Sequence, residues 1–463
     1  MELQWKNKDK SLFIDYDNNF TVHWVPKNCD LITESRNFLS FDNLNIYLPA
    51  RSILNSLILG DNIFVLNTLI YSFKNFKNKE KVKFVYIDPP YNTFNPELRY
   101  KDNLQHEEWL TFMRDRLERV KEILRKDGVI CIQIDDREFA RLYLLMIELF
   151  GEKNLKTIIV KMSESSGLKM QSVKNGGIPK LKEYLLLAKM DGIQGFHFKS
   201  VPKKSWDPEY NLFIKNFSEE DKKIIKFIQE KNTITHEDLL KLDYICKKFE
   251  LVTINKVLEE ENIKEEDKLK FFKENSWRIC RTASSNSIFK LTEEKKSILS
   301  ESQQVFTVLS KKGILYFVKS DYTPKARKPR VQILFADEHL STPIGDLWTD
   351  IKTTGLEFEG EIDFKNGKKP EKLMKRLIEG ITDEGDLVID LFGGSGTTAS
   401  VALELKRKFI STEVNNEIFL LARQRLLNKI RNLKNTANTS VLDINYLKIS
   451  DSSFDKENIL KKL

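Results

Sequence analysis

The chain has 463 residues, of which 41% are hydrophobic and 31% are charged. This length predicts two or three domains, and the hydrophobic share is enough to bury a core and too high for a disordered chain. We find no run of about 18 apolar residues and no signal peptide, so we expect a cytoplasmic protein without a membrane partner. The four cysteines lie far apart and the five histidines lack ligand spacing, so we expect neither a disulfide framework nor a metal site.

Basic residues slightly exceed acidic ones, 76 against 68, which gives a net charge of +8. This balance suits a nucleic-acid partner, although an ordinary basic protein would carry the same charge. Residues 161–182 and 319–330 concentrate the excess, and the second segment holds the side chains that we expect to contact DNA: Lys325, Arg327, Lys328 and Arg330. Residues 215–275 show helical core spacing but carry 13 Lys against 15 Asp or Glu, so we expect a scaffold or a docking surface there.

The first 50 residues mix short apolar runs with Asp and Asn turns and predict no definite element. An apolar run at 57–59 and a Gly turn then lead into a helical stretch through Ile70. Residues 84–87 predict a short buried strand. That strand ends at 88–91, because two successive prolines remove backbone donors and fix φ.

Helical spacing resumes from Trp109 to Leu124, and we expect Asp127-Gly128 to end this helix. Residues 129–134 predict a buried strand, and Asp135-Asp136 predict the cap of a helix through Leu149. Strands that alternate with helices in this way indicate an α/β domain with a largely parallel sheet.

The alternation returns after Trp348. We expect a helix opened by residues 368–370, a strand at 387–391, a Gly-rich turn with its helix, a strand at 409–413 and a last basic helix. From about residue 435 the chain becomes polar, which predicts a loosely held tail.

The Gly-rich turn at residues 392–396 joins a strand to a helix. Glycine lets the backbone approach a ligand closely, and a helix N-terminus offers free N–H groups and the positive end of a dipole. Glu413 ends the next strand, where a carboxylate can accept hydrogen bonds from both hydroxyls of an adenosine ribose. Residues 394–399 also fit the G-x-G-x-x-A pattern, so an NAD(P) site and a tight turn without a ligand are alternatives at this point.

Asp88-Pro89-Pro90-Tyr91 directly follows the strand at 84–87. A carboxylate and a nearby backbone carbonyl can accept both N–H hydrogens of an amino group conjugated to an aromatic ring, which turns its lone pair towards an electrophile. The prolines hold these acceptors rigidly and have no N–H that competes. The tyrosine ring offers a stacking face for a base taken out of the helix. A plain turn would not explain why the motif abuts a buried strand.

Together the two motifs resemble the catalytic motif and the S-adenosylmethionine motif of amino-methylating DNA methyltransferases. The catalytic motif comes first and the cofactor motif last, an order that resembles the β group of this family. The segments that are similar to modification subunits of type III restriction systems are 59–62, Asn92-Thr93, 347–351 and Lys369-Pro370. Phe94 departs from that pattern, because Gly is expected after Asn92-Thr93, and the chain is short for a type III modification subunit.

The resemblance implies an α/β, Rossmann-like methyltransferase domain with permuted motif order and an inserted target-recognition domain of mixed α+β or helical structure. The implied divisions are an N-terminal extension at 1–50, the catalytic half of the methyltransferase domain at 51–190, target recognition at 191–340, the cofactor-binding half at 341–434 and a C-terminal tail at 435–463.

The resemblance also implies roles for individual residues. Asp88 and the Pro89 carbonyl would hold the target amino group, Pro90 would complete the rigid turn, and Tyr91 would stack on the flipped base. The implied cofactor-binding residues are Asp61, Lys369, Asp390, Phe392, Gly394, Gly396, Thr397 and Glu413. Among these, Phe392 would pack against the adenine, Asp390 would lie near the amino group of the methionine portion, and Glu413 would hold the ribose.

The implied activity is sequence-specific transfer of a methyl group from S-adenosylmethionine to adenine N6 in double-stranded DNA, without a metal, as the host modification of a restriction–modification system. Asp in the first motif position favours adenine N6, whereas Ser there is associated with cytosine N4. A second protomer and a restriction subunit are the implied protein partners.

Four alternatives remain open at this point. An NAD(P)-dependent oxidoreductase would use the Gly-rich turn but leaves residues 88–91 without a role. Methylation of cytosine N4, or of RNA or a protein amide, would use similar chemistry, although the long segment between the motifs favours DNA. A DNA-binding protein without enzymatic activity would explain the basic segments but not two intact motifs.

Overall fold

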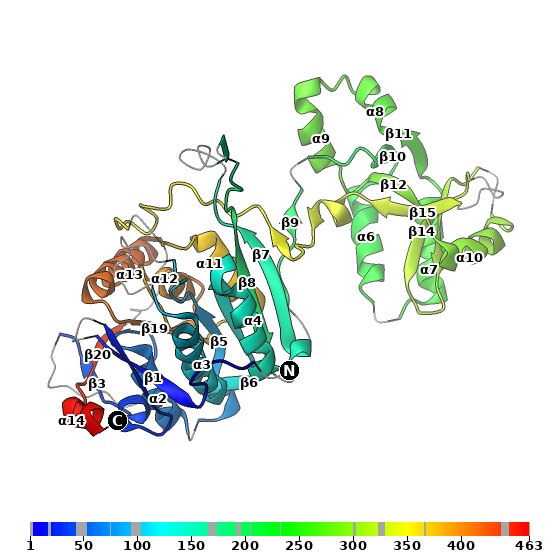
Figure 1. The fold of residues 1–463 in the computed structure, drawn as a ribbon. Coiled ribbons are helices and arrows are strands. Elements are labelled where there is room, and N and C mark those ends of the chain that lie inside the picture. The colour runs from blue at the N-terminus through cyan, green and yellow to red at the C-terminus, as the bar shows by residue number, and fades with distance from the viewer. Residues whose placement is uncertain are drawn as a thin grey trace. The chain divides into compact units, whose positions relative to one another are not determined.

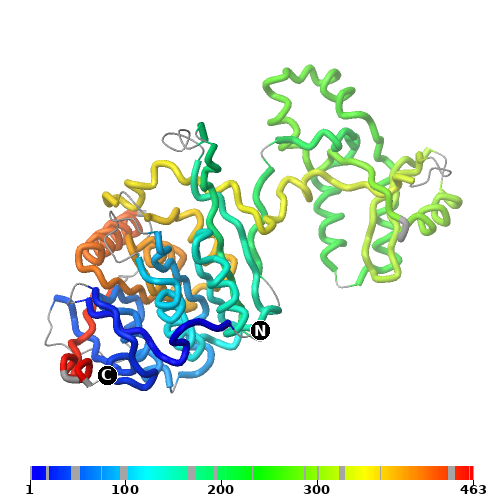
Figure 2. The backbone as a smooth tube through the Cα atoms, viewed as in Figure 1, coloured from blue at the N-terminus to red at the C-terminus, as the bar shows by residue number. Residues whose placement is uncertain are grey.

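The computed structural model describes residues 3–16, 20–42, 53–74, 76–93, 103–164, 173–174, 176–190, 196–203, 205–231, 233–299, 302–322, 329–364, 367–436 and 444–462. The chain forms two compact units (Figures 1 and 2). The larger unit combines residues 1–199 with residues 344–463, and the smaller unit comprises residues 200–343. The smaller unit therefore interrupts the larger one in sequence.

A ten-stranded sheet forms the centre of the larger unit, in the order β17-β7-β8-β6-β5-β18-β19-β4-β20-β3 (Figure 1). The strands from β6 to β20 run parallel, whereas β8 is antiparallel to both of its neighbours and β3 is antiparallel to β20. The strand bounds are β3 (Phe38–Ser40), β4 (Ser56–Leu59), β5 (Val82–Ile87), β6 (Leu124–Ile134), β7 (Leu155–Lys161), β8 (Lys182–Lys189), β17 (Leu347–Trp348), β18 (Leu387–Asp390), β19 (Lys408–Glu413) and β20 (Asn445–Ile449).

Strands from the two halves of the chain alternate at the centre of this sheet. β5 lies beside β18, with Tyr86 opposite Asp390, and β4 lies beside β19, with Leu59 opposite Glu413. Parallel neighbours end at the same edge of a sheet, where α/β proteins bind their ligands. The pairing of β5 with β18 therefore brings the segment after residue 87 next to the segment after residue 390.

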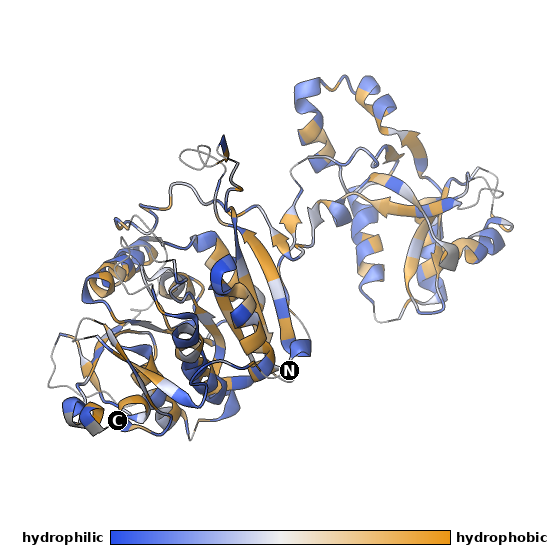
Figure 3. Ribbon diagram, viewed as in Figure 1, coloured by the Kyte–Doolittle hydropathy of each residue, from blue (hydrophilic) through white to orange (hydrophobic). Residues whose placement is uncertain are grey.

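Helices pack against both faces of the sheet. One hydrophobic core contains side chains of α2 (Asn62–Phe73), α3 (His106–Ile123) and α4 (Asp136–Phe150), and another contains side chains of α11 (Glu371–Ile381), α12 (Thr397–Glu404) and α13 (Asn416–Thr436). Side chains along β5 alternate between the cores, with Val85 in the first and Phe84 in the second. The central strands are accordingly hydrophobic (Figure 3). The expected α/β, Rossmann-like fold is confirmed.

Most predicted helix starts agree with the structure, but the end of α3 differs. Asp135 caps α4, where its carboxylate accepts a hydrogen bond of 2.8 Å from the backbone N–H of Arg137. α3 ends at Ile123, ahead of Asp127-Gly128. Leu124 is buried and pairs with Val82 of β5, and the register then shifts before Phe84. Strand pairing therefore overrides the turn pattern of Asp127-Gly128.

The first 40 residues, for which no element was predicted, form β1 (Lys10–Asp15), β2 (Thr21–Pro26), α1 (Asp30–Thr33) and β3. β1 and β2 pair antiparallel, and buried side chains of β1 join the core that contains α3. The Asp115 carboxylate of α3 accepts hydrogen bonds from the Ser11 hydroxyl and from the Leu12 N–H, at 3.3 and 3.0 Å. The N-terminal segment is thus part of the larger unit's core.

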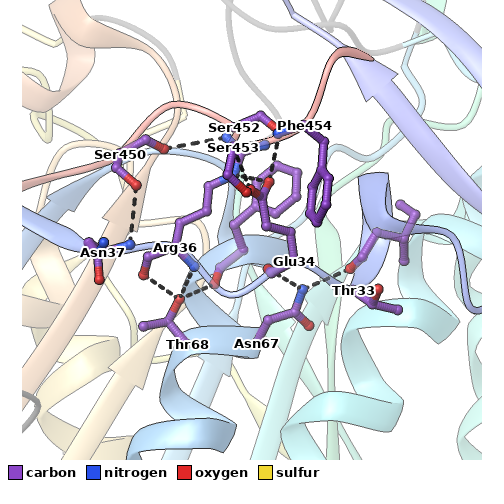
Figure 4. A network of polar contacts seen from close by, with 12 residues as sticks. Thr33, Glu34, Arg36, Asn37, Asn67, Thr68, Ser450, Ser452, Ser453 and Phe454 are labelled. Carbon is purple, nitrogen blue, oxygen red and sulfur yellow. Dashed lines mark hydrogen bonds and ion pairs between the residues drawn. The ribbon is translucent and has the colours of Figure 1, made fainter. Parts of the chain in front are cut away.

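The polar tail expected from about residue 435 is a further difference, because β20 lies inside the central sheet and α14 (Lys456–Lys462) follows it. Leu447 and Ile449 are buried, which supplies the alternation of a strand. Beyond β20, Ser453 donates to the Glu34 carboxylate from its N–H and its hydroxyl, both at 2.7 Å (Figure 4). Burial alone would raise the pKa of Glu34, but these hydrogen bonds and Arg36 outweigh it and lower that pKa.

The smaller unit is mixed α+β, as expected. Its six strands form an antiparallel sheet in the order β11-β10-β12-β15-β14-β13. The bounds are β9 (Val201–Pro202), β10 (Leu212–Lys215), β11 (Glu250–Thr253), β12 (Ile279–Ser284), β13 (Val305–Leu309), β14 (Leu315–Lys319), β15 (Arg330–Phe335), β16 (Ser341–Thr342), α6 (Glu219–Gln229), α7 (His236–Cys246), α8 (Ile254–Glu260), α9 (Lys268–Glu274) and α10 (Asn286–Lys296). The segment 215–275, expected to be helical, also contains β11, which pairs with β10.

Short elements complete both units. The 3₁₀ helices are η2 (Asn78–Glu80), η3 (Glu152–Asn154), η4 (Glu265–Asp267) and η5 (Asp337–His339). β9 and β16 pair antiparallel as a two-stranded ribbon where the chain enters and leaves the smaller unit. Within the described parts of the chain, every helix is too short or too polar to cross a bilayer.

Candidate functional site

One cavity of about 580 Å³ in the larger unit is lined by both sequence motifs. It opens beyond the carboxyl ends of β5, β18 and β19, where parallel strands of an α/β sheet present ligands to their loops. The motif residues in its wall are Asp88, Pro89, Pro90, Tyr91, Phe392, Gly394 and Glu413, together with Lys369. Sequence-distant residues are therefore joined in a single site.

Hydrogen bonds from neighbouring residues hold the segment 88–91 in place. The indole N–H of buried Trp109 donates to the Pro90 carbonyl at 2.7 Å. The following residue, Asn92, has φ of 60° and donates from its side-chain amide to Glu138 at 2.9 Å. Asparagine tolerates this left-handed backbone conformation better than most residues. These bonds hold the backbone that follows Asp88.

A compact cluster of charges occupies the catalytic end of the cavity. The Lys369 ammonium lies 3.1 Å from a carboxylate oxygen of Asp88 and 3.3 Å from one of Glu183. It also lies 3.0 Å from the Tyr91 hydroxyl and 4.8 Å from the centre of that ring. The Tyr91 hydroxyl in turn lies 2.8 Å from Asp88 and 2.9 Å from Glu183, and it has one hydrogen to donate between them. One cation therefore faces two carboxylates.

Glu183 reaches this cluster from β8. Because β8 runs antiparallel to β6, it begins at the edge where the parallel strands end, and its residue Tyr184 pairs with Ile134. The Gln133 amide donates to Glu183 at 2.6 Å and accepts from the Tyr86 hydroxyl at 2.6 Å. This buried chain of hydrogen bonds fixes the position of the second carboxylate.

The surroundings shift the pKa values of the Asp88 and Glu183 carboxylates in opposite directions. Burial raises the pKa of Asp88, and Glu183 adds to this, so the opposing effect of the Lys369 ammonium is overcome. Burial would also raise the pKa of Glu183, but Lys369 and the hydrogen bonds from Gln133 and Tyr91 outweigh it and lower that pKa. Glu183 is consequently the more persistent anion, and Asp88 is the better proton acceptor.

The Gly-rich turn shapes another part of the cavity wall. Gly393 lies so close to β19 that an added Cβ would meet the Ser411 hydroxyl oxygen at 2.2 Å, and Gly394 has φ of 49°. The Gly394 N–H donates to the Glu413 carboxylate at 3.1 Å, and the Asn415 N–H donates to the other oxygen at 2.8 Å. Burial raises the pKa of Glu413 in spite of these hydrogen bonds. The Glu413 carboxylate is therefore held as a hydrogen-bond acceptor beside two glycines, which have no side chain to fill the adjoining space.

Four residues that the resemblance implied as cofactor contacts are absent from the described cavity wall: Asp61, Asp390, Gly396 and Thr397. Asp390 accepts a hydrogen bond from the Phe392 N–H at 3.0 Å, and burial raises its pKa to about 7. An added Cβ on Gly396 would meet Cβ of Ala422 at 3.1 Å, so that glycine permits close packing against α13. The Thr397 hydroxyl accepts from Arg425 at 2.9 Å. Asp390, Gly396 and Thr397 therefore belong to the framework of the turn, whereas Asp61 caps α2.

Lys369 is placed at the catalytic end of the cavity rather than beside Glu413, because it pairs with Asp88 and Glu183. Phe392 lines the other end, with its ring centre 5.9 Å from that of Phe112. Of the basic residues expected to contact DNA, Lys325, Arg327 and Lys328 lie outside the described residues. Arg330 is exposed at the start of β15 and donates to the Thr282 carbonyl at 2.9 Å.

The cavity also contains residues that the sequence motifs did not indicate, above all Glu183, Arg137 and Tyr16. Glu183 and Tyr16 each stand beside an apolar strand segment, at 185–188 and 12–14. A charged or hydroxylated residue at the edge of a buried strand is the signal that would have identified them, but neither belongs to a motif with a characteristic spacing.

Curated relatives of this chain include proteins named as restriction–modification enzymes. It is 33% identical to the probable type III restriction-modification enzyme HindVI Mod subunit of Haemophilus influenzae over 401 residues, which cover 80% of this chain and 50% of that protein. It is 27% identical to the type III restriction-modification enzyme EcoPI Mod subunit of Escherichia phage P1, over 86% of this chain and 62% of that protein. The chain thus spans between half and two thirds of the length of these relatives.

Among solved structures, the complex of M1.HpyAVI with SAM aligns with 80% of this chain and 98% of that chain, at a TM-score of 0.37 and 13% identity. The DNA methylase family matches residues 82–424 of this chain. That range contains both motifs, the strands that carry them and Lys369 between them. The chain therefore belongs to the DNA methylase family.

Proposed function

We propose that this chain transfers a methyl group from S-adenosylmethionine to the exocyclic N6 amino group of adenine in double-stranded DNA. The observation that carries the proposal is the single cavity in which Asp88 and Pro89 share a wall with Phe392, Gly394 and Glu413. An oxidoreductase would need only the second set of residues. The juxtaposition of both sets supports transfer between a bound cofactor and an aromatic amine.

The residues at the Gly-rich end suit the adenosine cofactor. The cavity volume of about 580 Å³ falls within the range of about 300–1,000 Å³ that is usual for ligand pockets. Gly394 has no side chain to fill the space, and the nearest atom that an added Cβ would meet is 3.8 Å away. Glu413 would accept hydrogen bonds from the ribose, and Phe392 would pack against the adenine. When bound, S-adenosylmethionine supplies an electrophilic methyl group.

At the other end, Asp88 and the Pro89 carbonyl would accept the two N–H hydrogens of the target amino group. Methylation leaves that nitrogen with an additional positive charge, and it must lose one proton to become neutral. Asp88 is the proton acceptor that we propose, because it lines the cavity and because burial, together with Glu183, raises its pKa in spite of Lys369. Lys369 and Tyr91 would hold its carboxylate in the productive orientation.

Transfer of tritium from labelled S-adenosylmethionine to duplex DNA tests the activity, and chromatography of the digested DNA separates N6-methyladenine from N4-methylcytosine. Asp88→Ala should lower turnover by at least about 10²–10⁴-fold, the usual contribution of a positioned proton acceptor, while S-adenosylmethionine still binds. The matched control is Asp383→Asn, which changes an exposed carboxylate. Turnover near the wild-type level in Asp88→Ala would contradict the catalytic assignment, and label in cytosine would contradict the choice of adenine.

The wider setting is also a proposal. The relatives named as type III Mod subunits support host modification in a restriction–modification system, with the smaller unit as the target-recognition domain and with a restriction subunit or a second protomer as protein partners. Basic residues at 319–330 would supply salt-dependent affinity for DNA. Long-read mapping of methylated bases in cells that express the chain would identify the recognition sequence, and a chain that leaves no methylated motif would contradict the proposed setting.

A further inference from the structure

The N-terminal hairpin of β1 and β2 contributes three side chains to the wall of the cavity: Ile14, Tyr16 and Phe20. They line the same cavity as Phe392 and Glu413. The match to the DNA methylase family begins at residue 82, so it does not cover this part of the wall. The hairpin therefore adds apolar and aromatic side chains to the cavity wall that belong to neither motif.

Tyr16 is held in place by buried polar groups. Its hydroxyl donates a hydrogen bond to the Asp61 carboxylate. Asp61 also accepts from the Arg116 guanidinium at 2.8 Å and from the Ile63 N–H at 3.0 Å, as the N-cap of α2. The side chains of Arg116 and Asp61 are only 3% and 9% exposed. Asp61 and Arg116 are thus positioning residues that orient the Tyr16 ring at the wall.

Phe20 packs against Tyr16 with its ring edge-on, at a centroid distance of 5.5 Å and an interplanar angle of 79°. The backbone of Phe20 has φ of 56°, in the left-handed region that a bulky residue adopts only when its surroundings hold it there. The two rings form a preformed aromatic surface, and aromatic surfaces of this kind bind flat heteroaromatic ligands by stacking.

We propose that Tyr16 and Phe20 form the wall against which the adenosine portion of S-adenosylmethionine binds. This inference rests on the function proposed above and names further residues of the same site. Glu413 supports the placement, because its charge is among those that act on Tyr16, whose pKa burial and Asp61 raise well above the usual value. Tyr16 consequently remains a neutral ring beside the carboxylate expected to hold the ribose.

Calorimetry of Tyr16→Leu with S-adenosylmethionine and with adenosine tests the inference. Leucine keeps apolar volume but has no flat face, so we expect the dissociation constant to rise by about 5- to 30-fold for both ligands, within the usual range for loss of one stacking contact. Tyr16→Phe keeps the ring and should change affinity by less than about fivefold. The matched control is Tyr71→Leu, because Tyr71 is 74% exposed on α2, and its affinity should stay at the wild-type value.

Unchanged affinity in a folded Tyr16→Leu variant would overturn this inference while leaving the proposed function intact. A wild-type chain that binds no S-adenosylmethionine would overturn the proposed function and, with it, this inference. Hydrogen exchange of the wild-type chain provides a second measurement that does not depend on the folding of Tyr16→Leu. Saturating S-adenosylmethionine should slow exchange of the amides at 10–16 and 20–26, and unchanged exchange there would also overturn the inference.

Discussion

Replacement of Lys369 by methionine removes the ammonium that pairs with both Asp88 and Glu183. Methionine keeps much of the side-chain volume, so the change is chiefly one of charge. The Lys369 ammonium lies 3.1 Å from Asp88, and at an effective dielectric constant of about 20 such a pair interacts by about 5 kcal/mol. The two side chains remain 11% and 20% exposed, and we therefore expect about half of this energy, about 2–3 kcal/mol, to be lost.

The sign of the effect follows from the protonation state. Asp88 can take up the proton of the target amino group only when its carboxylate is ionised, so activity is lost as pH falls through its pKa. Without Lys369 the ionised form loses its counter-charge, and the ratio of ionised to protonated Asp88 should fall by about 30- to 150-fold at a given pH. The acid limb of kcat/KM for methyl transfer should therefore move to higher pH, with activity recovered in alkaline buffer.

Tritium transfer measured across the neutral and alkaline range checks this result. Lys372→Met is the matched control, because Lys372 lies three residues further along the chain, on α11, but is 54% exposed, and its pair with Asp350 should matter little. An acid limb that stays in place, or that moves to lower pH in Lys369→Met, would refute the reasoning that Lys369 stabilises the Asp88 anion.

Three further predictions concern binding and stability. Glu413→Ala should weaken the binding of S-adenosylmethionine by about 1–3 kcal/mol, the usual cost of losing hydrogen bonds to a buried carboxylate. Unchanged affinity in calorimetry would show that Glu413 is not part of the site. Gly396→Ala should lower the free energy of unfolding by about 1–3 kcal/mol more than Gly385→Ala, because both glycines have positive φ but only Gly396 would contact α13. Glu34→Gln should lower stability by about 1–2 kcal/mol at neutral pH. Since the folded-state pKa of Glu34 is lowered, that difference should be present above about pH 4 and vanish as pH falls through the folded-state pKa, and a pH-independent difference in chemical denaturation would contradict it.

The sequence predicted those elements whose own residues are enough to indicate a strand or a helix. β5, β18 and residues 129–134 of β6 are short, mostly apolar runs, because strands covered on both faces need hydrophobic side chains at most positions. α4 and α11 begin at a polar cap or after a proline. Their order along the chain was enough to predict alternating strands and helices.

The parts that the sequence did not predict depend on distant partners. β20 is a short polar strand, and only its position between β4 and β3 shows why it forms. β1 contains charged ends, and its burial follows from contact with α3. Local propensity carries no information about such pairings.

The site divides in the same way. Residues 88–91 and 392–396 were found because each motif is continuous in sequence, and the structure adds that they share a cavity. Membership of a motif did not reveal which side chains face that cavity, so Asp390 and Gly396 were expected as contacts although they support the turn. Glu183 was missed because its relation to Asp88 arises only from the antiparallel insertion of β8 beside β6.

The ribbon of β9 and β16 has a consequence for how the chain folds. Thr342 pairs with Val201 and Ser341 with Pro202, so the two ends of the smaller unit are held side by side by that unit itself. Once residues 200–343 have folded, they connect β8 to β17 as a short loop would. The larger unit then loses the closure entropy of a short loop instead of a long one, although this entropy grows only with the logarithm of loop length.

Such an arrangement lets one unit change without disturbing assembly of the other. A short glycine-rich linker between residues 199 and 344 would meet the same geometric requirement as the folded insertion. Exchange of the whole segment for another with neighbouring termini would likewise preserve the strand order of the central sheet. The fold thus separates the part of the chain free to diverge from the part that must keep its pairing.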